Sequence, residues 1–462
     1  MATTYLHSNT GTATNAKKFT LSMWIKRAKL CDSNSQRFYQ GYKDGNDRFY
    51  VMFDNTSGTP DAIWIYAVTG GTIELYWTSS RRFRDTNGWY HIVFSADSTQ
   101  ASQGDRFKVY VNGVEETSWT KTNNPSQNID WGNQLAQTNN TLTISGTESH
   151  SQLFDGSMSH IHFIDGTAYD ASAFGSQDAT TGEWKINTSP SVTYGNNGYF
   201  ILKDGNSVTD QSPNTNNFTV GAGTLTKTED CPSNVFNTFN PLDDYYEAGT
   251  FYNGNTTYQT GTASNKYGRN TSTLGMTSGK FYWEVKPVSV NTSIDYYPVI
   301  GITASQITGS QDYVGKAATD YSWSTNQDGS STVKYNNNND TAWGNHFALN
   351  SIVGVAVDLD NNKIYFSKDG VWQESGDPTS GSTGTGAAFT ITSASSTPLG
   401  AYFPSLSNYD GTGYVKFEAN FGNGYFGTTA VASAGTNASG IGIFEYAVPT
   451  GYTALSTKGL NL

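Results

Sequence analysis

The chain has 462 residues, enough for about two or three domains of ordinary size, and 14% of them are charged while another 14% are aromatic. The formal net charge is −12, and no Lys/Arg cluster is long enough to neutralise the phosphates of a nucleic acid, which argues against a nucleic-acid reader. No apolar run is long enough to span a membrane, and residues 1–20 lack the apolar core of a signal peptide, so we expect neither membrane insertion nor signal-dependent export.

The first lobe, residues 1–187, consists of short segments in which apolar and polar residues alternate. Phe19, Leu21, Met23 and Ile25 fall on the same side of an extended chain, which predicts a strand with one buried face. The Asn112–Gly113 pair predicts a hairpin turn, because both residues accept positive φ. Further strands are predicted over 48–53, 62–66, 89–94, 107–114, 142–146 and 158–164. Many short strands without a helical period between them predict a sandwich of antiparallel sheets.

The middle segment, residues 188–250, is dense in Asn, Thr, Ser, Pro and Gly. It nevertheless contains apolar anchors, among them Phe218, Phe236 and Phe239, which a disordered linker would not need. We therefore expect an ordered Asn/Gly-rich connector, partly one more strand of the first lobe and partly a strap between the lobes.

The second lobe, residues 251–462, shows the same alternation. Phe281, Trp283 and Val285 share one side of a predicted strand, and residues 352–367 form the clearest hairpin of the chain. Further strands are predicted over 299–302 and 414–421. The predicted fold class is therefore all-β, with two β-sandwich domains of the jelly-roll type joined by the connector.

No catalytic constellation is evident in the sequence. Enzymes that cleave sugars on jelly-roll folds place carboxylates at alternate positions of one strand, so that the acid and the nucleophile flank one bond. No such pattern occurs, and the adjacent Glu115 and Glu116 point to opposite faces of an extended chain. His160 and His162 share a strand face, as two metal ligands would, but no third ligand is evident and a pair that faces solvent or the opposite sheet is the alternative. We predict that the protein is not an enzyme and has no catalytic or metal site.

Cysteine occurs only at Cys31 and Cys231. Two cysteines this far apart form neither a disulfide framework nor a zinc site, and we interpret them as unpaired thiols. A single bridge between them is the alternative.

Four segments of the first lobe carry a family resemblance, namely 19–25, 89–93, 109–113 and 154–161. Together they resemble the laminin-G-like, concanavalin-type jelly roll over residues 19–174. Domains of that family often bind calcium, and the acidic loops 44–47 and 358–369 contain the oxygen ligands that calcium takes. Turn propensity explains these loops equally well, so we predict no cofactor, with calcium as the alternative.

The second lobe resembles the SPRY family over residues 280–426. The resemblance is carried in order by Trp283–Val285, Gly301, the central hairpin, Asp369–Gly370 and Asn420–Gly422, whereas Asn350–Ser351 replaces the Gly-Asp that usually precedes the hairpin. In SPRY relatives, partners dock on loops at one end of the sandwich. That implies a binding surface on the loops of this lobe.

The candidate ligand-binding residues are aromatic side chains expected on those loops. Rigid rings stack on sugar faces at low entropic cost, and the adjacent 336–340 run of Asn and Asp supplies polar contacts. The candidates are Tyr296, Tyr297, Trp323, Tyr335, Trp343 and Trp372. The alternative is that such rings close the ends of the core or meet a neighbouring subunit.

The combination of a jelly roll, an Asn-rich connector containing 230–234, a SPRY-like lobe and the ending 444–455 resembles virion proteins of tailed, particularly marine, bacteriophages. The resemblance implies a structural or adhesive component of the particle, such as a tail fibre, tail appendage or capsid decoration, at the virion surface. The partners it implies are other virion proteins, further copies of this chain (a trimer, for example) and a glycan or receptor on the host surface. The alternatives are a free carbohydrate-binding module and a polysaccharide depolymerase.

Overall fold

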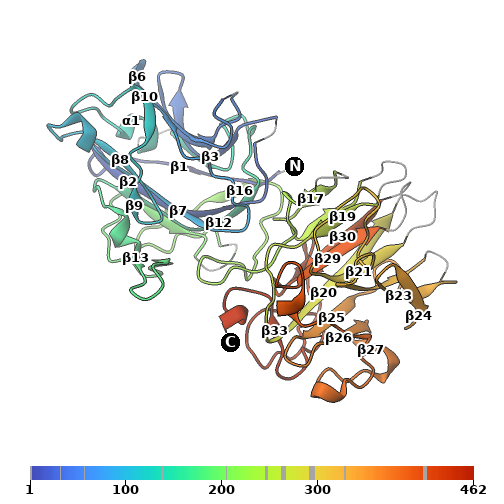
Figure 1. Ribbon diagram of the computed structural model, residues 1–462. Coiled ribbons are helices and arrows are strands. Elements are labelled where there is room, and N and C mark those ends of the chain that lie inside the picture. Colours follow the sequence, from blue (N-terminus) through green and yellow to red (C-terminus); the bar gives the residue numbers. More distant parts are fainter. Residues whose placement is uncertain are drawn as a thin grey trace. The chain divides into compact units, whose positions relative to one another are not determined.

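The computed structural model describes residues 3–31, 33–56, 58–136, 140–203, 205, 207–244, 248–261, 267–290, 297–326, 329–408 and 414–461. The chain divides into two compact units, unit 1 over Met1–Lys227 and unit 2 over Thr228–Leu462 (Figure 1). Within the described residues, the one α-helix is the single turn α1 (Gly132–Leu135), and no helix is long and apolar enough to cross a membrane. The predicted all-β class with sandwich domains is confirmed.

Unit 1 is a sandwich of an eight-stranded and a six-stranded sheet, with the strand orders β10-β6-β5-β4-β3-β11-β1-β16 and β15-β12-β2-β7-β8-β9. The larger sheet consists, in that order, of Trp119–Asn123, Thr72–Ser79, Ile63–Thr69, Asp47–Phe53, Gln36–Asp44, Thr141–Ile144, Tyr5–Asn9 and Thr219–Ala222. The smaller consists of Tyr199–Ile201, Gly156–Asp165, Lys18–Arg27, Tyr90–Asp97, Phe107–Val111 and Val114–Glu115. Neighbouring strands are antiparallel, as the short alternating segments predict.

The core of unit 1 lies between these sheets and follows the period of two in the sequence. Phe19, Leu21, Met23 and Ile25 of β2 all lie in it, as predicted. The turn between β8 and β9 is also as predicted, with φ of 47° at Asn112 and 81° at Gly113.

The outer face of the six-stranded sheet is covered by the chain that follows it. A second apolar cluster there includes Val93, Ile164 and Phe200 from the sheet and Phe174 and Tyr194 from the covering segment. The strands β13 (Gly175–Gln177) and β14 (Trp184–Ile186) form a hairpin in this covering segment. The prediction of one buried face for β2 was therefore wrong: Thr20, Ser22 and Trp24 on its other side are buried too.

Unit 2 contains a nine-stranded and a six-stranded sheet. The first runs in the order β17-β18-β30-β20-β25-β26-β27, with β28 beside β26 and β33 beside β20. Its strands in that order are Thr250–Tyr252, Thr257–Gln259, Val415–Asn420, Lys280–Val290, Val353–Asp358, Lys363–Lys368, Val371–Trp372, Phe389–Thr390 and Thr453–Ala454. The second, β19-β29-β21-β22-β23-β24, consists of Arg269–Thr271, Phe403–Asn408, Pro298–Thr303, Asp320–Thr325, Thr332–Asn336 and Asn339–Ala342. The short strands β31 (Tyr425–Phe426) and β32 (Thr429–Ala430) pair with each other.

The core of unit 2 contains the alternating residues predicted for it. Phe281, Trp283 and Val285 of β20 are in this core, together with Val355 and Phe366 of the central hairpin. The opposite side of β20 is also buried, because residues of the C-terminal segment pack on it. Tyr282 and Tyr365 of the sheet meet Phe444, Val448 and Tyr452 there.

The predicted connector is divided between the two units. Residues up to 227 belong to unit 1 and supply β15 and β16. Phe236 and Phe239, further along, are buried in clusters of unit 2. The apolar anchors thus belong to the two cores.

Candidate functional site

The most distinctive surface of unit 1 is the outer face of β4, β5 and β6 in the eight-stranded sheet. Along these strands the residues that face the core, such as Val51, Ile65 and Leu75, alternate with residues that face outward. Four of the outward residues are aromatic and half-buried, and we call them the aromatic quartet: Tyr50, Trp64, Tyr66 and Tyr76.

The strand register brings the quartet together. Tyr66 lies opposite Tyr50 on one side and opposite Tyr76 on the other. The rings of Tyr50 and Tyr66 stack with centroids 5.1 Å apart, and those of Trp64 and Tyr76 stack at 5.4 Å. Cross-strand aromatic contacts of this kind contribute about 0.5–1.5 kcal/mol each beyond the area they bury. The quartet is therefore a platform held by its own packing.

Two arginines border the quartet. The guanidinium of Arg37 on β3 lies 3.8 Å from the ring centroid of Tyr50, and that of Arg48 on β4 lies 5.5 Å from the centroid of Tyr66. Arg37 donates to Gln40 Oε1 and, at 3.1 Å, to Gln152 Oε1. Gln40 in turn donates to Glu148 Oε2 at 2.6 Å. The rim of the quartet is thus a network of planar polar groups.

The quartet face combines flat apolar rings with planar donors and acceptors. Sugar rings present an apolar face of C–H groups and a rim of hydroxyls, so this is the combination that holds them. Hydrolysis by paired carboxylates needs two acids that flank one bond, and no described strand of unit 1 contains more than one Asp or Glu.

The quartet was not among the residues predicted from the sequence. Tyr50 and Tyr76 each stand between two apolar residues, as Phe49-Tyr50-Val51 and Leu75-Tyr76-Trp77. The sequence of such runs predicts strands that are buried on both faces. The available signal was that Tyr50, Trp64, Tyr66 and Tyr76, which alternate with apolar inward residues, all have a ring with a hydroxyl or indole N–H.

The predicted loop aromatics of unit 2 have varied surroundings. Tyr296 lies outside the described residues. Trp323 is on β22, is 0% exposed, and packs on Phe347 with ring centroids 4.6 Å apart, so it belongs to the core. Tyr297 is half-buried just before β21, where its backbone N–H donates to Asn408 Oδ1 at 3.3 Å.

Tyr335, Trp343 and Trp372 are half-buried and lie on or beside strands. Tyr335 of β23 packs edge-on against Tyr313, with centroids 5.2 Å apart. The 336–340 run forms the β23–β24 turn, with φ of 54° at Asn337 and 58° at Asn338. Asn345 N donates to Gln373 Oε1 at 2.8 Å, which brings the segment after Trp343 beside the one after Trp372.

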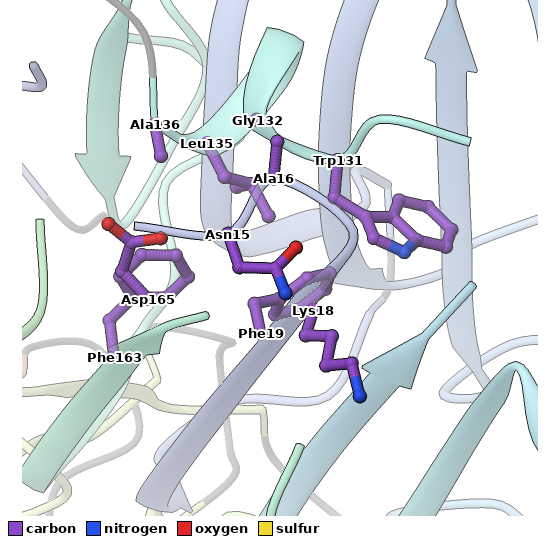
Figure 2. Close-up of a pocket in the computed structure, with 10 residues that line it drawn as sticks. All are labelled: Asn15, Ala16, Lys18, Phe19, Trp131, Gly132, Leu135, Ala136, Phe163 and Asp165. Carbon is purple, nitrogen blue, oxygen red and sulfur yellow. The ribbon is translucent and has the colours of Figure 1, made fainter. Parts of the chain in front are cut away.

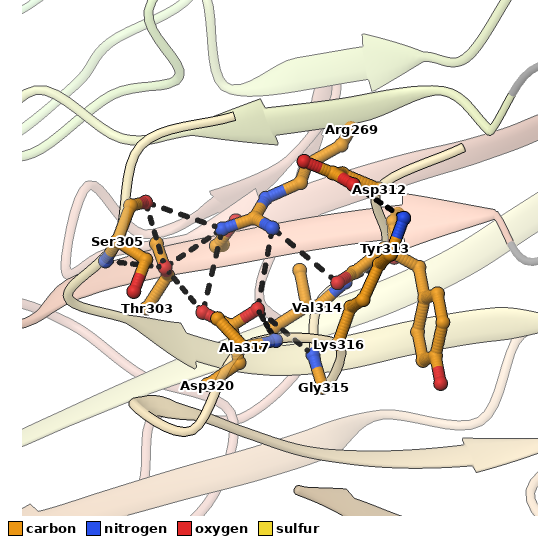
Figure 3. A network of polar contacts seen from close by, with 12 residues as sticks. Arg269, Thr303, Ser305, Asp312, Tyr313, Val314, Gly315, Lys316, Ala317 and Asp320 are labelled. Atoms are coloured by element: carbon orange, nitrogen blue, oxygen red, sulfur yellow. Dashed lines mark hydrogen bonds and ion pairs between the residues drawn. The ribbon is translucent and has the colours of Figure 1, made fainter. Parts of the chain in front are cut away.

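The loop that carries Tyr313 is held by a buried ion pair (Figure 3). Arg269 of β19 contacts Asp320 of β22 at 3.3 Å, and Thr303 donates to the same carboxylate at 2.6 Å. Asp320 also accepts the backbone N–H groups of Gly315 and Ala317, each at 3.2 Å. A carboxylate with so many donors is fully engaged in structure, so this network positions the loop.

The small pocket of unit 1 shown in Figure 2 is lined mostly by apolar groups, among them Phe19, Trp131 and Leu135. Its charged residues are already engaged. Asp165 accepts Thr14 N and Asn197 Nδ2, both at 2.9 Å, and Lys18 pairs with Asp97 at 3.0 Å. The pocket offers no free charged group among the described residues to orient a ligand.

The histidines of the predicted pair are buried, and the strand bulges between Ser159 and His162, with φ of 46° at His160. His162 stacks on Phe200 at 3.8 Å, and its Nδ1 is 2.9 Å from Tyr194 Oη. The described residues contain no group of three or more His, Cys, Asp or Glu side chains that would hold a metal.

The acidic loops considered for calcium use their carboxylates in turns. Asp44 accepts Asn46 N at 2.7 Å, and Asp358 accepts Asn361 N at 2.9 Å and pairs with Lys280 at 3.0 Å. Cys31 and Cys231 are both free thiols in this structure.

The match to a known family lies within unit 1. Residues 1–173 match the model of the concanavalin A-like lectin/glucanases superfamily. The predicted resemblance of the first lobe to a concanavalin-type domain is thereby confirmed. Among curated proteins, none matches the sequence.

Solved structures with remote similarity include the SPRY domain of human HERC1, at 17% identity and a TM-score of 0.29, over 39% of this chain and 96% of that one. A candidate carbohydrate-binding protein from Bacteroides ovatus matches at 15% identity and a TM-score of 0.32, over 50% of this chain and 59% of its own. Domain 4 of the arabinanase AbnA from Geobacillus stearothermophilus matches at 18% identity and a TM-score of 0.24, over 34% of this chain and 64% of that one.

Proposed function

We propose that the protein binds glycans without cleaving them and is a structural or adhesive component at the surface of a tailed bacteriophage particle. The observation that carries the binding role is the aromatic quartet with its arginine rim, on a rigid sheet within a region that matches the concanavalin A-like lectin/glucanases superfamily.

The geometry of the quartet supports a glycan as the ligand. Neighbouring strands are about 4.8 Å apart, so side chains on three adjacent strands span roughly 10 Å, a length suited to more than one sugar ring. A site on strands is also more rigid than one on loops, and its rings lose little conformational entropy when they bind.

Binding without turnover is favoured over hydrolysis because the quartet face lacks the paired carboxylates described above. The superfamily name covers both lectins and glucanases, so the match leaves both activities open. The single carboxylate in the rim network, Glu148, lies in the turn after β11 and accepts a hydrogen bond from Gln40.

Placement on a phage particle rests on the resemblance given in the sequence analysis. In this proposal the protein acts as a tail fibre, tail appendage or capsid decoration. Its partners are other virion proteins, further copies of itself and a host-surface glycan. Gold-labelled antibody against the protein should decorate purified particles in electron micrographs; unlabelled particles would contradict the placement.

The binding role is tested with Tyr66→Ala and Trp64→Ala. We expect each to lower the affinity for bacterial surface polysaccharides by about tenfold, or about 1.4 kcal/mol, in isothermal titration. Tyr110→Ala is the matched control, because Tyr110 is a half-buried tyrosine on β8 in the other sheet. Equal affinity of all variants would overturn the assignment, and release of reducing sugar by the unaltered protein would overturn binding without cleavage.

A further inference from the structure

The arginines of unit 1 differ in what they bind. Arg27, Arg81 and Arg84 each pair with a carboxylate, at 2.9, 2.9 and 3.1 Å. Arg82 and Arg106 instead donate to backbone carbonyls, three bonds each. These five side chains are engaged in holding loops and strands.

The two arginines at the quartet have a different environment. Neither Arg37 nor Arg48 forms an ion pair with any described residue. Arg37 donates to two neutral amides and its Nε has no partner among the described residues, while Arg48 makes one side-chain hydrogen bond, to Gly45 O at 2.8 Å. Because Nε of Arg37 is buried, the donors left for a ligand are the remaining N–H groups on the terminal nitrogens of Arg37 and those of Arg48.

The electrostatic setting of Arg37 favours an anion. Burial lowers the pKa of Arg37, although an arginine stays charged at neutral pH. Glu148 is the nearby opposite charge and Arg48 a nearby like charge, but no described carboxylate forms an ion pair with Arg37. A half-buried charge without an ion-pair partner is costly, and a guanidinium binds a carboxylate through two parallel hydrogen bonds. Glu148, which faces this group from the neighbouring segment, is bound to Gln40 and not to the guanidinium.

We infer that the ligand of the quartet face is an acidic polysaccharide, whose carboxylates pair with Arg37 and Arg48 while its sugar rings pack on the aromatic quartet. This inference rests on the proposed glycan binding and specifies the class of glycan. The chain as a whole has a net charge of −12, so general attraction would not recruit a polyanion. Recognition has to come from these two local cations.

The test compares polysaccharides with and without their carboxylates. Polygalacturonate, alginate and hyaluronate are each used before and after chemical reduction of the carboxyl groups to alcohols, which leaves the sugar rings in place. For at least one of them we expect the full-length protein to bind the native chain about tenfold more tightly than the reduced chain. Polyglutamate and dextran sulfate should bind no more tightly than the reduced chain.

Variants of the two arginines complete the test. Arg37→Gln and Arg48→Gln should each lower the affinity for the acidic chain about tenfold and leave the affinity for the reduced chain unchanged. Arg37→Lys should recover little, because lysine lacks the planar fork. Arg82→Gln is the matched control for the loss of one arginine of unit 1 without a carboxylate partner.

The outcomes separate this inference from the proposed function. Equal binding of native and reduced chains would overturn the acidic specificity and leave glycan binding intact. Binding of polyglutamate or dextran sulfate as tight as that of the acidic polysaccharide would show recognition of charge alone and would also overturn the inference. Binding of no polysaccharide in the panel would count against both.

Discussion

At the scale of single residues, His91 shows how burial fixes a protonation state. Its side chain is buried under Trp184, whose indole Nε1 donates to His91 Nδ1 at 2.9 Å. An indole can only donate, so Nδ1 has no proton and Nε2–H faces Ser22 Oγ, 2.9 Å away. Burial lowers the pKa of His91 to about 3. Protonation would place two N–H groups against each other, which the fold resists.

This arrangement predicts a loss of stability in acid. The folded-state pKa of His91 lies below its unfolded value of 6.5, so its contribution is present above pH 6.5 and is lost as the pH falls toward 3. Between the two pKa values, unfolding takes up one proton, and each unit of pH changes the free energy of unfolding by about 1.4 kcal/mol. We therefore expect the free energy of unfolding to fall by about 2 kcal/mol between pH 6.5 and 5 through this group. Urea denaturation of the wild type and of His91→Gln at both pH values measures the difference. An equal pH dependence of the two proteins would contradict the prediction.

At the scale of elements, the C-terminal segment is fastened to β20 by one carboxyl group. Glu284 is 0% exposed and accepts the backbone N–H groups of Glu445 and Tyr446, at 2.9 and 2.8 Å. The Tyr282 hydroxyl and Asn420 Nδ2 donate to it as well, both at 3.1 Å. Four donors thus converge on two oxygens, and the apolar residues Phe444 and Tyr452 pack beside them.

Glu284→Gln should therefore loosen the C-terminal segment. The amide replaces one acceptor oxygen by a donor, which leaves at least one buried N–H unsatisfied and costs about 1–3 kcal/mol. Burial raises the pKa of Glu284 to about 7, so its favourable contribution is greatest below its usual value of 4.5 and declines as the pH rises through 7. The stability gap between wild type and variant should accordingly narrow from pH 5 to pH 8.

The measurements for Glu284→Gln are thermal unfolding and limited proteolysis of the C-terminal segment. Asp340→Asn on the exposed strand β24 is the control for the loss of one carboxylate. If Glu284→Gln melts and is cleaved as the wild type is, the carboxyl group does not hold the segment.

The elements also show what the sequence could predict. The alternation of apolar and polar residues identified most of the long strands. It also identified the core faces of β2, β20 and the central hairpin, because each such strand buries a row of apolar side chains. It could not show that the opposite faces are covered, since that depends on segments far away in the chain. Trp323 stands between Ser322 and Ser324, a pattern typical of a surface, yet all three are buried. On the side of the serines, Ser322 Oγ donates at 2.6 Å to Val314 O, from a separate loop.

At the scale of the whole molecule, residues 188–227 belong to unit 1 as parts of its core. Tyr199, Ile201, Leu202 and Phe218 are buried in the main cluster of the sandwich. Burial of large apolar side chains contributes about 1.5–3 kcal/mol each, so these four contribute roughly 6–12 kcal/mol. That is comparable to the total stability of a typical domain, about 5–15 kcal/mol. Ending the unit at residue 187 would therefore remove a stabilisation about as large as the whole free energy of unfolding of a typical domain.

We accordingly expect a fragment of residues 1–227 to fold alone and a fragment of residues 1–187 not to. The shorter fragment lacks β15 and β16, which leaves the edges of β12 and β1 unpaired, and it loses Phe200 from the cluster over the six-stranded sheet. Amide hydrogen exchange and near-ultraviolet circular dichroism distinguish the two outcomes, since a packed aromatic core gives slow exchange and a strong aromatic signal. Cooperative unfolding of the 1–187 fragment at the temperature of the longer one would show that the later strands are dispensable. Loss of structure in the shorter fragment alone would establish that the chain after the jelly roll completes it.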